Sequence, residues 1–412
     1  MTRSRITSLR RACVPIGGLG AALMVVAACG AGSVDGAGPT GSGSGQAGAP
    51  SRSSPSLDSA AASQAEQAQA GAPGPYAVGR RTITVTDPAR NGRTLATDIW
   101  YPVDPAATGG AAPSEYEFLP GLGYTSEVSL ADAPAAKGTF PLLVYSHGGG
   151  GFSWVATFFT EFMASKGYVV VAPNHTGNTA LDAITGSGGA SDDVNANNRP
   201  SDVTVTLDTI LAANDDPADP LTGIVDASRI AVSGHSWGGF TSLATISGHA
   251  TSLGSTPPDP RVSAIVLMAP YAEKLSPEEL AKVDVPVLVV SSTGDTSTPI
   301  ETDTVPVATL VPGRPLVRLD IDGGAHASFT DACALREAVA GNPNVPEAVL
   351  AELDRRGKDA CAPGVLDSKV IQNITNSYSA AFLATQLSGS TDFRQMLACV
   401  APPEQATCTD VK

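Results

Sequence analysis

Apolar runs separated by turn residues follow one another along the chain from Tyr76 onward. The first two alternate apolar and polar residues, at 81–85 and 95–101, and flank an Asn91-Gly92 turn signal. This pattern predicts an antiparallel hairpin at the start of the domain. Six later runs are almost continuously apolar, at 142–145, 168–172, 229–232, 264–267, 287–290 and 316–319. Continuous apolarity indicates strands buried on both faces, as in a parallel sheet covered by helices.

Helical patterns occupy several of the intervals between these strands and the end of the chain. They lie at about 153–166, 202–213, 237–248, 331–340, 346–356 and 367–387. The alternation predicts an α/β domain with about eight mostly parallel strands and helices on both faces. We see no internal repeat and no second core, so residues 76–412 are expected to form one domain.

The interval between the strands ending near Tyr101 and beginning near Leu142 differs from the others. It is rich in Gly, Ala and Pro, with aromatic residues such as Tyr116, Phe118 and Tyr124 interspersed. We expect a long loop over the sheet edge near Gly148–Gly151. It contains no amphipathic helix that would act as a lipase lid, so the cleft is expected to be thinly covered.

Composition excludes one large class of function. The 412 residues are 42% hydrophobic, enough for a substantial core, and carry 25 Lys and Arg against 40 Asp and Glu, a net charge of −15. Nucleic-acid binding needs excess Lys and Arg to displace counterions from phosphates, so no nucleic-acid partner is expected.

The N-terminus has the features of an export signal. Residues 1–28 contain four Arg and no acid, followed by an apolar run that ends Val26-Ala27-Ala28-Cys29-Gly30. This ending resembles a bacterial lipobox, which implies cleavage before Cys29 and lipidation of its thiol. We therefore expect a lipoprotein on the outer face of the membrane in the bacterial cell envelope. An ordinary signal peptide or a small anchor helix is the alternative.

The segment after Cys29 has a linker composition. Residues 30–75 are mostly Gly, Ala, Ser, Pro and Gln, with four scattered charges and no periodic pattern. This predicts that 29–75 comprises the lipidated Cys and a flexible linker. Residues 60–70 can form transient helix, but they have no apolar face with which to pack.

Four cysteines remain near the C-terminus, at Cys333, Cys361, Cys399 and Cys408. An even number in an exported chain predicts two disulfides. Proximity favours Cys333–Cys361 and Cys399–Cys408, although four cysteines allow three pairings. Zinc is the rival interpretation, but the spacings are unsuitable and no His lies among them, so neither a metal nor a cofactor is expected.

The strongest chemical motif is Gly234-x-Ser236-x-Gly238, which follows a buried strand and opens a helix. This is the context of a nucleophile elbow, in which a sharp turn lifts the Ser hydroxyl out of the sheet. Bulky residues at 234 and 238 would clash in such a turn. Ser236 is therefore the candidate nucleophile.

A serine nucleophile needs a base, and in this chain order the base follows it. His249 ends the helix that Ser236 opens and points away, which leaves His326, just past the last strand. His147 is expected to be structural, and His175 to end a strand and line the cleft.

The acid must lie between the nucleophile and the base. Asp295 directly follows the strand 287–290, where its carboxylate can accept from the other imidazole nitrogen. Glu273, Asp303 and Asp322 are weaker candidates.

Two backbone N–H groups are expected to hold the oxyanion of the attacked carbonyl. One belongs to Trp237, and the other to Gly149 in the glycine-rich loop after the strand 142–146, with Gly148 and Gly150 as neighbouring alternatives. A phosphate-binding loop is the rival for these glycines, but the Lys-Ser/Thr of a P-loop is missing.

Together these motifs resemble α/β-hydrolases called platelet-activating-factor acetylhydrolase-like or predicted dienelactone hydrolase. The similar segments are Tyr76 to Arg80, Asp87 to Arg93, Asp98 to Pro102, Ser146 to Gly150, Gly234 to Gly239 and Gly324 to His326. The resemblance covers about residues 76–390 and implies an α/β-hydrolase fold and metal-free hydrolysis of esters, often with short acyl groups.

Two positions depart from that family. Dienelactone hydrolases have Cys in place of Ser236, and eukaryotic acetylhydrolases carry the acid one strand earlier, at Ala269-Pro270. The position of Asp295 is instead similar to that in bacterial cutinase-like polyester hydrolases.

These observations predict a monomeric serine esterase with a Ser236-Asp295-His326 triad acting on a small-molecule or lipid ester. The membrane would be a partner only through the N-terminal lipid anchor. A cutinase-like polyester hydrolase or lipase is the alternative. A non-catalytic binding lipoprotein and a serine peptidase are further alternatives.

Overall fold

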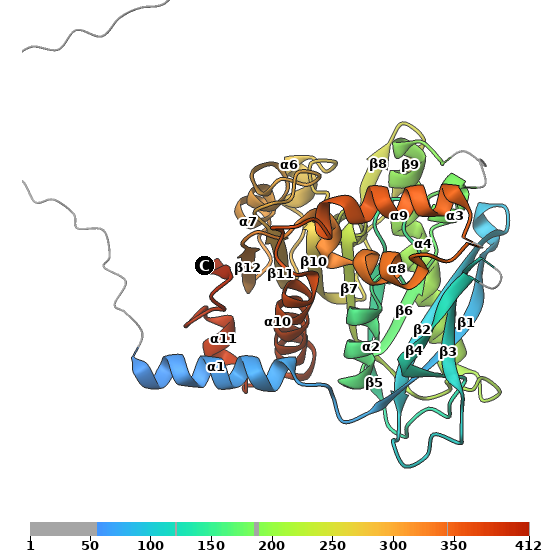
Figure 1. Ribbon diagram of the computed structural model, residues 1–412, viewed down its shortest axis with the longest axis horizontal. Helices are drawn as coiled ribbons and strands as arrows, with labels where there is room; N and C mark the ends of the chain where they lie inside the picture. The colour runs from blue at the N-terminus through green and yellow to red at the C-terminus, as the bar shows by residue number, and fades with distance from the viewer. Residues whose placement is uncertain (1–55, 120–121, 185–188, 344, 412) are drawn as a thin grey trace, which may run out of the picture. The chain divides into compact units, whose positions relative to one another are not determined.

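The computed structural model describes residues 56–119, 122–184, 189–343 and 345–411 (Figure 1). The predicted signal segment 1–28, Cys29 and the first part of the predicted linker lie outside these residues. Within the described ranges, no helix is both long enough and apolar enough to cross a membrane.

A parallel sheet forms the centre of the domain. Its six parallel strands are β5 (Phe140–Ser146), β6 (Val169–Pro173), β7 (Val225–Ser236), β10 (Val262–Pro270), β11 (Val287–Ser292) and β12 (Leu316–Ile321). Each coincides with one of the continuously apolar runs. In the described part of the chain the sheet has eleven strands, ordered β13-β12-β11-β10-β7-β5-β6-β2-β1-β4-β3.

Antiparallel strand pairs lie on both sides of the parallel strands. The predicted opening hairpin is present as β1 (Ala77–Asp87) and β2 (Arg93–Val103), and its turn contains Asn91 at φ 55°. At the other edge β13 (Ala406–Val411) pairs with β12, a strand that sequence analysis missed. A separate small hairpin joins β8 (His249–Thr251) and β9 (Gly254–Thr256).

Helices cover both faces, as predicted for the α/β-hydrolase fold. The longer ones are α2 (Thr157–Ser165), α4 (Asp192–Asp215), α5 (Trp237–Ser247), α8 (Ala332–Val339), α9 (Glu347–Ala360) and α10 (Ser368–Ser388). Short ones are α3 (Ala180–Ile184), α6 (Pro277–Leu280), α7 (Val305–Leu310) and α11 (Arg394–Leu397), with single turns at Pro88–Arg90, Ile300–Thr304 and His326–Phe329. Alternate residues of β5 enter two different cores: Leu143 and Tyr145 pack in one, Leu142 and Val144 in the other.

The interval 102–141 is not an irregular loop. It contains β3 (Pro113–Leu119) and β4 (Leu122–Ala131), which pair with each other and extend the sheet beyond β1. The buried Tyr116 hydroxyl accepts from Trp100 Nε1 (2.6 Å) and donates to Glu161 Oε1 (2.7 Å). The loop prediction was wrong because exposed Glu115 and Glu117 alternate with buried residues, which is the pattern of an edge strand.

Helix α1 (Leu57–Gly71) corrects the linker prediction. Its N-terminus is capped by the Ser56 side chain, and it packs on α10 and α11. Gln67 Nε2 donates to Ala401 O (2.8 Å), and Glu66 Oε2 accepts from Met396 N (2.7 Å). The flexible-linker prediction is therefore wrong for residues 57–71. Alanine favours the helix, and hydrogen bonds and small side chains provide the contact that an apolar stripe usually provides.

Both disulfides that proximity favours are present. Cys333 and Cys361 are joined with an S–S distance of 2.08 Å, and Cys399 and Cys408 with one of 2.01 Å. The first links α8 to the residue that follows α9, and the second links β13 to the segment that follows α11.

Asp331, at the start of α8, makes stability depend on pH. Its buried carboxylate accepts from the N–H (2.5 Å) and hydroxyl (2.7 Å) of Thr157, the first residue of α2. Burial, together with the nearby charge of Glu161, raises the pKa of Asp331 to about 7. The folded chain therefore holds this proton more tightly than the unfolded chain, in which the pKa is about 3.9.

We predict that the free energy of unfolding contributed by Asp331 falls as pH rises from about 4 to about 7. Asp331→Asn stays neutral and keeps an acceptor for Thr157, so it should lose this dependence. The thermal unfolding midpoints of wild type and variant should be measured at pH 5 and at pH 8. Between these pH values the wild-type midpoint should fall relative to that of the variant by a few degrees or more, the size that corresponds to about 1 kcal/mol. Parallel pH profiles for the two proteins would contradict the assignment.

Candidate active site

Ser236 occupies a sharp turn between β7 and α5. Its backbone lies at φ 57° and ψ −118°, a strained conformation for a residue with a side chain. The flanking glycines leave no room for a side chain: a Cβ at 238 would lie 1.8 Å from the carbonyl oxygen of Ser146, and one at 234 would lie 2.3 Å from the backbone of Gly238. This is the geometry of a nucleophile elbow, and it places Ser236 at the carboxyl end of the sheet.

His326 and Asp295 meet at the same end of the sheet. His326 follows β12, Asp295 follows β11, and His326 Nδ1 lies 2.7 Å from Asp295 Oδ2. Ser236 and His326 both line one cleft. Of the other candidate acids, Asp303 accepts from the backbone N–H of Glu273 instead. Asp295 is thus the carboxylate that the structure pairs with the candidate base.

Asp295 is held ionised by several donors. Burial by itself would raise its pKa, but the contact with His326 and hydrogen bonds from Thr298 outweigh it, so the pKa lies below its usual value. The Ser297 and Thr298 N–H groups donate to Oδ1 at 2.7 and 3.0 Å, and the Thr298 hydroxyl donates to Oδ2 at 2.8 Å. An ionised acceptor places a proton on His326 Nδ1 and leaves Nε2 to accept from a serine hydroxyl.

Thr298 is a site residue that sequence reasoning missed. Its hydroxyl also lies 3.2 Å from His326 Nδ1 and 3.1 Å from the carbonyl oxygen of Ala269. An Asp followed three residues later by Thr is a recognisable side-chain turn, and this spacing was the available signal.

The glycine-rich loop after β5 brings Gly149 against Trp237. A Cβ on Gly149 would lie 2.8 Å from Trp237 Cδ1, and Gly148, Gly149 and Gly151 line the same cleft as Ser236. The carbonyl of Gly148 accepts from His147 Nδ1 (2.7 Å) and from Gly151 N (3.0 Å). Because a peptide unit is planar and trans, these bonds also fix the direction of the Gly149 N–H.

His147 has the structural role that was expected. It is fully buried, and its second ring nitrogen, Nε2, accepts from the backbone N–H of His175 (3.1 Å). His249 is likewise engaged elsewhere, with Nδ1 2.8 Å from Glu279 Oε1.

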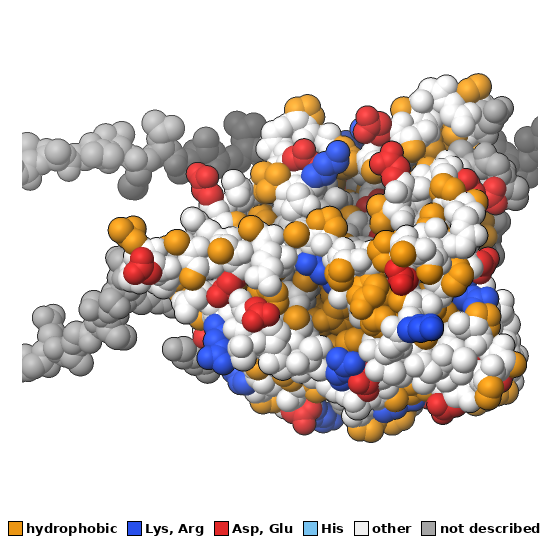
Figure 2. Space-filling model, turned by 90° about the horizontal axis from the view of Figure 1, so that it is seen from below, with side chains coloured by type: hydrophobic (Ala, Val, Ile, Leu, Met, Phe, Trp, Pro, Cys, Tyr) orange, Lys and Arg blue, Asp and Glu red, His pale blue; other side chains and the backbone are white. Residues whose placement is uncertain are grey.

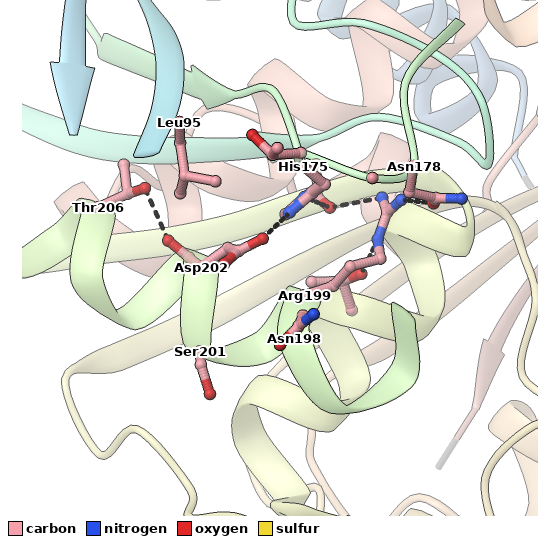
Figure 3. Close-up of polar contacts among 12 residues, drawn as sticks. Leu95, His175, Asn178, Asn198, Arg199, Ser201, Asp202 and Thr206 are labelled. Carbon is pink, nitrogen blue, oxygen red and sulfur yellow. Dashed lines mark hydrogen bonds and ion pairs between the residues drawn. The ribbon is translucent and has the colours of Figure 1, made fainter. Parts of the chain in front are cut away.

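His175 does not line the cleft, which corrects the sequence prediction. Its Nδ1 lies 3.0 Å from Asp202 Oδ2 (Figure 3). Its Nε2 lies 2.9 Å from Ser146 Oγ. The order Ser, His, Asp is that of a catalytic triad, but all three residues are fully buried. Burial, with Arg199 nearby, lowers the pKa of His175 to about 4, so the ring is neutral at pH 7. We interpret this group as structural.

Arg199 connects the buried group to the glycine-rich loop. Its guanidinium, fully buried, donates to the carbonyl of His147 and the side chains of Ser146, Asn178 and Thr241 (Figure 3 shows Arg199 and Asn178). The carbonyl of Asn178 in turn accepts from Gly150 N (3.0 Å). Burial lowers the pKa of Arg199 to about 9, which still leaves it charged at pH 7. A buried cation on α4 therefore holds both ends of the loop that would bind an oxyanion.

The cleft itself has a volume of about 190 Å³. Besides the glycines, Ser236 and His326, it is lined by Phe152, Val155, His235, Ser297, Ala327, Thr330, Ala332, Leu335, Leu353, Arg355 and Asp359. Helices α8 and α9 thus form one wall, where an uncovered or thinly covered cleft had been expected. In the described residues, no three His, Cys, Asp or Glu side chains are placed to share a metal ion.

Another hollow, of about 340 Å³, lies near the start of β5 and includes Phe140, Lys166, Tyr168 and Arg229. Figure 2 views the molecule from below and shows a hollowed area with hydrophobic side chains and Lys or Arg beside it. The residues at the amino ends of β5, β6 and β7 border this hollow, whereas Ser236 ends β7, so the hollow is separate from the cleft.

Comparisons with known proteins agree with this geometry. A family model described as "PETase: PET hydrolase-like" matches residues 153–340, which include Ser236, Asp295 and His326. A ferulic acid esterase from Streptomyces cinnamoneus superposes with a TM-score of 0.59 at 22% identity, over 82% of this chain and 97% of that one. No curated protein matches the sequence.

The protein is a carboxylic ester hydrolase. The comparisons support both inferences drawn from the sequence motifs, the esterase activity and the α/β-hydrolase fold. The hydrolase is similar to the PET hydrolase-like family over the segment that carries the elbow, the candidate acid and the candidate base.

The esterase offers a test of the loop support. Arg199→Gln should lower kcat/KM by on the order of 10- to 100-fold, less than the loss of an oxyanion donor outright, because the glycine loop loses its fixed position. KM should change little. Thr206→Val, which removes another buried hydroxyl of α4 that bonds within the helix, is the control. Unchanged turnover in folded Arg199→Gln would show that the loop does not depend on the guanidinium.

Proposed function

We propose that the esterase is a serine hydrolase in which Ser236 attacks the ester carbonyl, His326 accepts its proton and Asp295 orients His326. The contact of His326 Nδ1 with Asp295 Oδ2, at 2.7 Å, beside a strained Ser236 in the same cleft, is the observation that carries the proposal. The protonated His326 then donates to the leaving alcohol, and an acyl-enzyme forms on Ser236.

In this proposal the N–H groups of Gly149 and Trp237 hold the negative charge that develops on the carbonyl oxygen. Support comes from the contact of the two residues and from the bonds that fix the Gly148 carbonyl. Water, activated by the same His326, then attacks the acyl-enzyme and releases the acid. Each step uses groups already held in place, so little reorganisation is needed when charge develops.

The substrates we propose are esters of short acyl groups, as in platelet-activating-factor acetylhydrolase-like enzymes. The volume of the cleft, about 190 Å³, and its closure on one side by Leu335 and Leu353 support a small acyl group. A long acyl chain would have to leave the cleft past these side chains.

Aromatic or polymeric esters are the second candidate. The PET hydrolase-like match and the name of the ferulic acid esterase favour them. The ring of Phe152 also lines the cleft and packs 4.2 Å from that of Trp154. Phe152 is thus placed to contact a planar acyl group.

Attachment to the outer face of the cell membrane through Cys29 is also part of the proposal. The lipobox-like ending Val26 to Gly30 supports it, as does the excess of acids, which a negatively charged lipid surface would repel. Acyl chains would then be the main membrane-binding element.

Activity on p-nitrophenyl esters of increasing chain length tests the substrate class. We expect the highest kcat/KM at about C2–C6, with each buried CH₂ contributing at most about 0.8 kcal/mol until the pocket ends. The series should include p-nitrophenyl benzoate to test the aromatic candidate. A maximum at palmitate, or a sharp rise above the micellar concentration, would contradict the short-acyl proposal.

Fractionation of cells that express the full chain tests the anchor. Wild type should sediment with membranes, and Cys29→Ser should be released to the soluble fraction because no thiol remains to carry lipid. Cys13→Ser is the matched control and should remain bound. Retention of Cys29→Ser on membranes would refute the anchor.

A further inference from the structure

Helices α8 and α9 lie side by side (Figure 1). Each contributes one leucine to the lining of the cleft. Leu335 comes from α8 and Leu353 from α9, and both are buried, with exposed fractions of 8%. They stand with Val155 and Ala332 in the apolar part of the lining, whereas Arg355 and Asp359 are its polar members on α9. An acyl chain that extends from Ser236 toward these helices would contact apolar side chains.

A second, smaller cavity, which we call the slot, lies on the other side of the same leucines. It is lined by Gly123, Tyr124, Trp154, Leu335, Ala338, Val339, Val349 and Leu353, and its volume is about 20 Å³. Apart from one glycine, every lining residue is apolar or aromatic. Leu335 and Leu353 are the two residues that border both this slot and the catalytic cleft.

The two leucines therefore form the partition between cleft and slot. On its far side stand the rings of Tyr124 and Trp154, whose centroids are 6.0 Å apart. The Tyr124 hydroxyl is engaged by Thr157 Oγ1 at 3.1 Å. Removal of the leucine side chains would join the two spaces into one apolar channel that ends at aromatic rings.

A disulfide and an ion pair connect the two helices that carry the partition. Cys333, two residues before Leu335, is joined to Cys361, which follows α9. Arg336 Nε also lies 2.6 Å from Asp354 Oδ1, so an ion pair connects the residues next to the two leucines. The disulfide and the ion pair thus connect α8 to the end of α9 and to the residue beside Leu353.

We propose that Leu335 and Leu353 set the acyl-chain limit of the esterase by closing the cleft against the slot beside Tyr124 and Trp154. The proposal rests on the proposed function, because it needs an acyl group attached to Ser236. The slot lining contains no charged residue, so the chemistry it would accept when opened is a methylene chain or a phenyl group.

The test is kcat/KM for p-nitrophenyl acetate, butyrate, octanoate and benzoate in Leu335→Ala, Leu353→Ala and the double variant. We expect the octanoate-to-acetate ratio to rise by on the order of 10-fold or more, since each newly buried methylene is worth up to about fourfold and octanoate would place at least two beyond the partition. Acetate has no methylene to place beyond the partition, so it serves as the reference substrate for each variant.

Leu350→Ala is the matched control. Leu350 lies on α9 and packs against the same core, but it borders neither the cleft nor the slot. Its octanoate-to-acetate ratio should equal that of wild type. Leu353→Val, a smaller truncation, should shift the ratio in the same direction by less and covers the case in which the alanine variants do not fold.

The outcomes separate the two proposals. Unchanged ratios in Leu335→Ala and Leu353→Ala, with acetate hydrolysis retained, would overturn the partition and leave the esterase mechanism standing. An equal rise in Leu350→Ala would also overturn it, since general loosening of α9 would then be the cause. If the wild-type protein hydrolyses none of these esters, that result would instead contradict the proposed function.

Discussion

The left-handed backbone of Ser236 is the constraint on which the site depends. A non-glycine residue at φ 57° costs on the order of 1–3 kcal/mol, so the surrounding packing must hold it there. Gly238 lies against the carbonyl of Ser146, Gly239 packs on Pro270, and Tyr271 N donates to the carbonyl of Ser236 (2.9 Å). The ends of β5, β7 and β10 are thereby held together, and the candidate acid and base that follow β11 and β12 meet this fixed point.

Buried charged side chains lie beside the glycine-rich loop at the same end of the sheet. Arg199 bonds mainly to neutral oxygens around the glycine loop, while the buried carboxylate of Asp202 is engaged by Arg90, Arg93 and His175. Burial would raise the pKa of Asp202, but its contacts with Arg93 and His175 lower it strongly. A cation left beside the loop, and not cancelled by a direct carboxylate contact in the described structure, favours negative charge at the place where an oxyanion would form.

Much of this arrangement was predictable from sequence because its causes are local. Continuously apolar runs such as 287–290 became the parallel strands, since their residues are buried on both faces of the sheet. The glycines at 234 and 238 indicated the elbow, since a side chain there would collide with the backbone. Asp295 and His326 followed from their positions after strands, because the carboxyl ends of parallel strands meet at one edge.

What escaped prediction depends on partners distant in sequence. Helix α1 has no apolar stripe, and it is held by contacts such as Gln67 to Ala401 that lie far apart in the chain. Strand β3 alternates exposed Glu115 and Glu117 with buried residues, but its buried side is completed by Glu161 of α2, a contact distant in sequence. The wall that α8 and α9 add to the cleft likewise depends on tertiary packing, which periodicity does not report.

Reaction with a fluorophosphonate tests the central claim most directly, because phosphonylation needs an activated serine and an oxyanion site but no particular acyl group. The account predicts one adduct per chain, located on Ser236 by peptide mass spectrometry. The adduct should be absent from Ser236→Ala and form far more slowly in His326→Ala. An adduct on any other residue, or undiminished labelling of folded Ser236→Ala, would contradict the assignment of Ser236 as the nucleophile.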